Sequence, residues 1–122
     1  MIKGTVTDYL EPLVPLVLVE TNGKTHDVEA IVDTGFDGAL SLPSSVIATL
    51  GWSWRTRGRA LLADGSESVF DIYEGKVLWD GKPRRILVDE ADTTPLIGMS
   101  LLSGYKLEME IQKAGKITIV RL

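Results

Sequence analysis

The most informative stretch of this sequence is an apolar run that leads into a carboxylate, a hydroxyl residue and a glycine, and then into a second apolar run. It reads Ile31-Val32-Asp33-Thr34-Gly35-Phe36-Asp37-Gly38-Ala39-Leu40-Ser41-Leu42-Pro43. The tripeptide Asp33-Thr34-Gly35 is by itself a weak signal, because an aspartate that caps its own backbone in an ordinary turn gives the same pattern. Whether this tripeptide forms a structural turn or a functional loop therefore has to be judged from the segments on either side of it.

Two helical patterns accompany this stretch. The segment Ser44–Gly51 follows it directly, with serine near the start, glycine at the end and apolar residues at helical spacing. Much later, two bulky aliphatic residues and a glycine precede a turn or two of helix over Met99–Ser103, in the run Pro95-Leu96-Ile97-Gly98-Met99-Ser100-Leu101-Leu102. Both predicted helices are short.

Most of the remaining chain is typical of short β-strands joined by tight turns. The turn pairs Asn22-Gly23, Asp80-Gly81 and Ala114-Gly115 each lie between two runs rich in Val, Leu and Ile. The expected hairpins are Leu13–Glu20 with Thr25–Val32, Ser66–Trp79 with Lys82–Val88, and Tyr105–Ile111 with Lys116–Leu122. Gly75 predicts a break within the longest of these strands. Many short strands indicate an all-β sandwich or barrel, and a length of 122 residues suits one domain, 1–122.

Taken together, these motifs resemble the retropepsin-like (retroviral-type) aspartic proteases, and in particular their small single-domain bacterial members. The resemblance covers about Val28 to Lys106. It implies an all-β, retropepsin-like closed β-barrel with a flap hairpin and one or two short helices. It also implies that Pro95–Leu102 supplies the hydrophobic-hydrophobic-glycine motif that packs beneath the catalytic loop.

The same resemblance implies an aspartic endopeptidase in which Asp33, Thr34 and Gly35 form the catalytic loop. Two carboxylates held close together share one proton, so that one acts as base and the other as acid toward a water molecule. The chain contains one Asp-Thr-Gly, which makes a homodimer necessary to bring two copies of Asp33 together. A non-proteolytic member that kept the fold as a dimerisation or peptide-binding module is the alternative.

Further residues are expected to bind a peptide or protein substrate. These are Phe36 and Asp37 beside the catalytic loop, and the tip of the predicted flap, Ala63, Asp64, Gly65 and Ser66. An ordinary hairpin turn is the competing interpretation of that tip. Phe36 offers no hydroxyl to the carboxylates, which predicts activity at higher pH than in pepsin-like enzymes. Met99 stands where retroviral members carry an arginine that pairs with the acid corresponding to Asp37, so Asp37 lacks its expected partner.

Composition excludes several other classes of function. The sequence has no cysteine, which removes disulfides, thiolate nucleophiles and Cys-type zinc sites. We expect no cofactor and no metal. A net charge of -4 and arginines that alternate along one exposed strand face, Arg55, Arg57 and Arg59, argue against nucleic-acid binding. No apolar run is long enough to span a membrane and the first residues lack a signal peptide, so the expected location is cytoplasmic.

Overall fold

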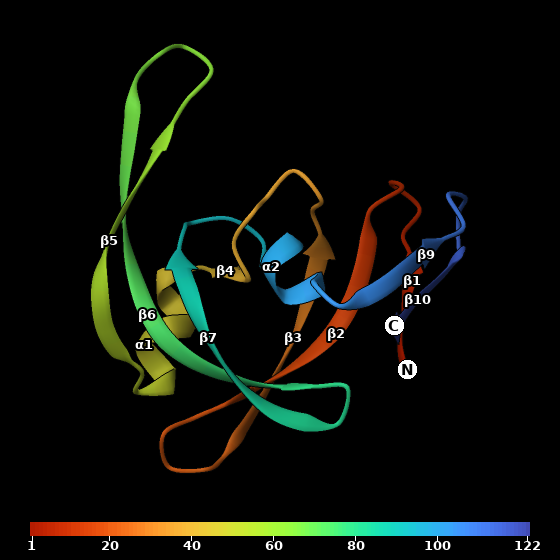
Figure 1. The fold of residues 1–122 in the computed structure, drawn as a ribbon, viewed down its shortest axis with the longest axis horizontal. Coiled ribbons are helices and arrows are strands. Elements are labelled where there is room, and N and C mark those ends of the chain that lie inside the picture. The colour runs from red at the N-terminus through yellow and green to blue at the C-terminus, as the bar shows by residue number, and fades with distance from the viewer.

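The computed structural model describes all 122 residues and consists of ten strands and two short helices (Figure 1). The strands are β1 (Ile2–Val6), β2 (Pro12–Val19), β3 (Thr25–Val32), β4 (Leu40–Leu42), β5 (Ser53–Leu61), β6 (Glu67–Trp79), β7 (Lys82–Glu90), β8 (Leu96–Ile97), β9 (Tyr105–Met109) and β10 (Lys116–Arg121). The helices are α1 (Ser44–Leu50) and α2 (Met99–Leu102). Neither helix is of a length and apolarity that would let it cross a bilayer.

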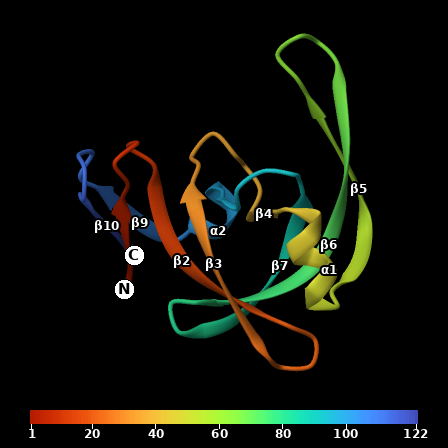
Figure 2. The ribbon, with the colours of Figure 1, turned by 180° about the vertical axis from the view of Figure 1, so that it is seen from behind.

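All ten strands belong to one sheet, in the order β5-β6-β7-β4-β8-β3-β2-β1-β10-β9. The sheet closes on itself because β6 also pairs with β2, through Val17 with Leu78 and Leu18 with Val77. This contact completes a ring of β2, β3, β8, β4, β7 and β6, in agreement with the predicted barrel. Strands β1, β9 and β10 extend the sheet on the side away from the β5–β6 hairpin, and both termini lie there (Figures 1 and 2).

The three predicted hairpins are present, and the Asp80-Gly81 turn has the expected two-residue backbone. Asp80 and Gly81 both have positive φ, at 52° and 78°, which matches the twist of strands β6 and β7 in a two-residue turn. Gly23 has φ 86° between β2 and β3, and the Asn22 side chain accepts a hydrogen bond from the Lys24 amide at 2.9 Å. Local turn chemistry therefore determines where these strands reverse.

The predicted break at Gly75 is wrong, because β6 continues through this residue, which pairs with Ile86 of β7. A Cβ atom at Gly75 would lie 2.8 Å from a carbon of the Trp52 ring and 2.8 Å from a methyl of Val88. The glycine makes room for a buried indole and leaves the strand unbroken.

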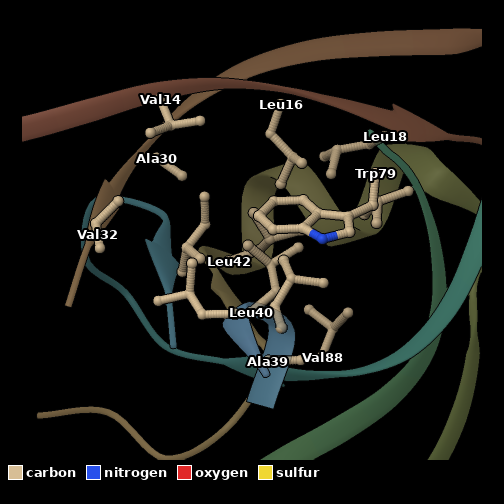
Figure 3. Close-up of a cluster of buried hydrophobic side chains, with 14 of the residues drawn as sticks. Val14, Leu16, Leu18, Ala30, Val32, Ala39, Leu40, Leu42, Trp79 and Val88 are labelled. Carbon is tan, nitrogen blue, oxygen red and sulfur yellow. The ribbon is translucent and has the colours of Figure 1, made fainter. Parts of the chain in front are cut away.

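A large part of the core lies inside the ring of strands (Figure 3), and Val6, Ile117 and Ile119 of β1 and β10 extend it. Alternate residues of β2, namely Val14, Leu16 and Leu18, are buried and point inward, as the two-residue period of a strand requires. They meet Leu40 and Leu42 of β4, which are fully buried. The residues that lead into and out of the Asp33 loop are thus fixed by the core.

Candidate active site

Asp33 lies at the point where the chain leaves the buried end of β3. Strand β3 runs parallel to β8 there, and the Asp33 amide donates to the Ile97 carbonyl at 2.9 Å. One carboxylate oxygen of Asp33 accepts a hydrogen bond from the Gly35 amide at 2.9 Å. Asp33 is half-buried, whereas Thr34 and Gly35 are exposed on the surface of the single chain. The loop is therefore held by a backbone hydrogen bond at its start, and its tip is exposed to solvent.

The segment that begins α2 makes three backbone hydrogen bonds to the same loop. The Gly98 amide donates to the Ala39 carbonyl at 3.0 Å, the Met99 amide to the Phe36 carbonyl at 2.8 Å, and the Ser100 amide to the Gly38 carbonyl at 3.1 Å. A Cβ atom at Gly98 would lie only 2.1 Å from the Gly38 carbonyl oxygen, so only glycine permits this approach. The predicted contact between the Ile97-Gly98 motif and the loop is confirmed.

Phe36 packs against this glycine-lined surface. Ring atoms of Phe36 lie 2.6 Å from the positions that Cβ atoms would occupy on Gly38 and on Gly98. The half-buried ring therefore covers both glycines and also forms part of the wall of a cleft. The absence of a side chain at two positions explains how a large aromatic residue fits so close to Asp33.

The cleft has a volume of about 820 Å³ and lies between the Asp33 loop, the end of β7 and the β5–β6 hairpin. Four of the predicted site residues line it, namely Asp33, Gly35, Phe36 and Asp37. Thr34 and the flap-tip residues Ala63, Asp64, Gly65 and Ser66 do not line it in the single chain. Residues lower on the hairpin take that place, among them Ala60, Leu62 and Phe70.

The β5–β6 hairpin extends well beyond the barrel and ends in a tight turn (Figures 1 and 2). Asp64 accepts two hydrogen bonds from Ser66, at 2.5 Å from its hydroxyl and 2.9 Å from its amide. These bonds lower the pKa of the Asp64 carboxyl, the hydroxyl bond contributing most. The geometry at Asp64 is that of a capped turn, which agrees with the competing interpretation given above. Gly65 has φ 86°, and Leu61 and Leu62 expose apolar surface next to the turn.

The alternating arginines of β5 pair across this hairpin with acids of β6. Arg55 pairs with Glu74, Arg57 with Asp71 at 3.5 Å, and Arg59 with Glu67 at 3.7 Å. All are exposed, so each pair stabilises the hairpin only slightly. In each pair the two charges offset one another, and of the three arginines only Arg59 lines the cleft.

Asp89 is a cleft residue that the sequence did not single out. It lies on β7 and pairs in register with Ser41 of β4, and its carboxylate approaches Gly38. Burial, and secondly the nearby charge of Asp37, raise the pKa of Asp89 to about 6. The only hint in the sequence is its place after the apolar run Ile86-Leu87-Val88, in an acid-rich segment that continues to Asp92.

Comparison with known proteins supports the fold. No family model matches the sequence, and no curated protein matches it. Among solved structures, the chain is similar to the crystal structure of a retropepsin-like aspartic protease from Rickettsia conorii, with a TM-score of 0.60 and 20% identity. The match covers 99% of this chain and 90% of that chain. The fold is therefore retropepsin-like, in agreement with the resemblance inferred from Asp33-Thr34-Gly35 and Ile97-Gly98.

Proposed function

We propose that the protein is a homodimeric aspartic endopeptidase in which Asp33 of each chain activates one water molecule. The observation that carries the proposal is the position of Asp33. It is a half-buried carboxylate at the end of β3, in a retropepsin-like fold, and it lines a cleft large enough for several residues of extended peptide. Peptide or protein chains are the expected substrates.

The chemistry follows from bringing two such carboxylates together. At a separation of about 3 Å they repel by roughly 5 kcal/mol at an effective dielectric of 20, so the pair retains one proton over a wide pH range. The ionised carboxylate removes a proton from the water as it attacks the scissile carbonyl. The protonated carboxylate donates to the developing oxyanion, and a proton then passes to the leaving nitrogen. The two copies of Asp33 titrate as one unit.

The exposed loop tip supports the dimer. Thr34 and Gly35 are accessible in the single chain and lie beside the half-buried carboxylate, where a twofold axis would bring the two loops together. By resemblance to the retropepsin-like enzymes, the Thr34 hydroxyl bridges the two loops and Gly35 lets the substrate backbone approach. Leu62 of the β5–β6 hairpin is exposed and lines the cleft, which supports a flap that closes over a bound peptide.

A peptide-binding or dimerisation module without proteolysis is the second candidate. Its support is the environment of Asp37, which takes part in no salt bridge and faces a second acid, Asp89. In such a module the cleft would bind extended peptides and Asp33 would only cap its loop.

The dependence of activity on protein concentration tests the proposal. Cleavage of a mixed fluorogenic peptide library should fall more steeply than linearly when the protein is diluted through the dimer dissociation constant, measured in parallel by sedimentation. An aspartic-protease inhibitor of the transition-state type should abolish the signal. Full specific activity in a sample that sediments as a monomer would refute the shared active site.

A further inference from the structure

One end of the cleft holds a buried hydroxyl group without a partner. The Ser41 side chain is 4% exposed, and its oxygen makes no hydrogen bond within the protein. Ser41 lines the cleft and pairs in register with Asp89 across the parallel strands β4 and β7, which puts both side chains on the same face of the sheet. A buried hydroxyl normally has a hydrogen-bond partner. The Ser41 oxygen has none within the protein, and Ser41 belongs to the wall of the cleft, so this hydroxyl retains an unused capacity for a hydrogen bond at that wall.

The carboxylates of Asp37 and Asp89, at the same end of the cleft as Ser41, have no cationic partner. Neither Asp37 nor Asp89 takes part in a salt bridge. The other charged groups that line the cleft do not supply the missing positive charge. Asp33, Glu90 and Asp92 add negative charge, whereas Asp71 pairs with Arg57 and the single lining cation, Arg59, pairs with Glu67. The complementary ligand group is a cation that can donate several hydrogen bonds.

The number of oxygens favours an ammonium group over a metal ion. Calcium takes six to eight oxygen ligands, whereas this corner offers two carboxylates and one hydroxyl, and no group of three His, Cys, Asp or Glu in the chain could hold a metal. A lysine ammonium has three donors, which match the two carboxylates and the hydroxyl. Its four-carbon stem can run along the apolar cleft wall made by Phe36 and Leu96.

We propose that Ser41, Asp37 and Asp89 form a specificity subsite that binds a lysine side chain of the peptide substrate. The proposal rests on the endopeptidase function above, and in a symmetric dimer the subsite occurs twice. A preference for lysine is therefore expected at two positions, one on each side of the scissile bond. The raised pKa of Asp89 agrees with a carboxylate that gains a favourable environment only when a cation is bound.

The test uses two matched peptide sets. Each is a series of apolar octapeptides in which one position at a time carries either lysine or norleucine, which has a similar stem but no charge. At two positions the wild-type protein should cleave the lysine peptide about tenfold more efficiently, as expected for charge-assisted hydrogen bonds, and this ratio should rise between about pH 5 and pH 7 as Asp89 ionises.

Variants identify the residues responsible. In Asp89→Asn the ratio of lysine to norleucine cleavage should fall toward one, and Ser41→Ala should lower it in part. Asp27→Asn is the matched control, since Asp27 is exposed on β3 outside the cleft and its replacement removes the same charge. That control should keep the wild-type ratio. A wild-type ratio near one at every position, or a ratio that Asp89→Asn leaves unchanged, would overturn the subsite.

Binding separates the subsite from catalysis. The same peptides, labelled with a fluorophore, should bind to Asp33→Asn with the lysine preference intact, measured by anisotropy. If the wild-type protein cleaves nothing while this preference is observed, the endopeptidase function fails and the subsite stands. If peptides are cleaved without any preference for lysine, the subsite alone fails.

Discussion

Replacing Asp89 by asparagine should make the protein more stable at neutral pH. Burial and the neighbouring Asp37 raise the pKa of Asp89 from the ordinary 3.8 to about 6, which means that the folded state favours the protonated form. A raised pKa of an acid costs stability that develops as the pH rises above the unfolded value, and this cost is complete above the folded value. Asparagine has a similar shape and no charge, so it should remove that cost.

The size of the effect follows from the pKa. The change from 3.8 to about 6 corresponds to about 3 kcal/mol if it is felt in full. Because Asp89 is only half-buried, solvent screening reduces the expected gain to roughly 1 kcal/mol. The gain should be small near pH 4, develop between about pH 4 and pH 6, and stay constant above that range.

Thermal or urea unfolding of the wild type and the variant at about pH 4 and about pH 8 measures this difference. A gain of roughly 1 kcal/mol corresponds to about 4 °C in the melting temperature of a domain of this size. Asp27→Asn, exposed on β3, is the matched control for the loss of one charge, and as a surface substitution it should change the stability little. Equal stabilisation by Asp89→Asn at both pH values would refute the electrostatic reasoning, and destabilisation at pH 8 would show that the ionised carboxylate has a favourable partner.

Three further substitutions probe the loop and its support. Gly98→Ala should cost about 3 kcal/mol or more in the free energy of unfolding, because its Cβ would lie 2.1 Å from the Gly38 carbonyl oxygen, whereas Gly104→Ala should cost only about 1 kcal/mol for its positive φ. Equal costs in urea unfolding would contradict the proposed packing. Thr34→Ala should weaken the dimer by about 1 kcal/mol for each of two symmetric hydrogen bonds and leave the subunit fold unaffected, since Thr34 is exposed; an unchanged dissociation constant in sedimentation would exclude the bridge. Phe36→Ser should move the alkaline limb of the pH–rate profile of peptide cleavage to lower pH, because a hydroxyl donor favours the ionised carboxylates; activity of the wild type confined below about pH 4 would contradict this role of Phe36.

Features that depend on neighbouring residues could be predicted from the sequence. Turns such as Asp80-Gly81 and the helix that ends at Gly51 follow from backbone preferences within a few residues. The contact between the Asp33 loop and Ile97-Gly98 spans more than sixty residues, and it was predicted only through the resemblance to a known family.

Features that depend on packing between distant strands could not be predicted. Ser41 and Asp89 are register partners because β4 and β7 are parallel neighbours, and nothing in either segment indicates that pairing or its register. Gly75 looked like a strand break because its role depends on Trp52, which is distant in the sequence. The flap tip was expected to bind substrate, but in the single chain the cleft is lined by residues lower on the hairpin. A role for Ala63, Asp64, Gly65 and Ser66 in substrate binding stays a prediction.

The most direct test of the aspartic protease proposal is a paired measurement on Asp33→Asn. Asparagine retains an oxygen that can accept the hydrogen bond from the Gly35 amide, now 2.9 Å from the carboxylate, so the loop should keep its shape. Cleavage of the peptide library should fall to background because the shared proton is lost. The dimer dissociation constant should stay the same or decrease, because the repulsion between two carboxylates is removed. Wild-type cleavage by this variant would contradict the proposed mechanism, and dissociation or unfolding would show that Asp33 serves only to cap its loop.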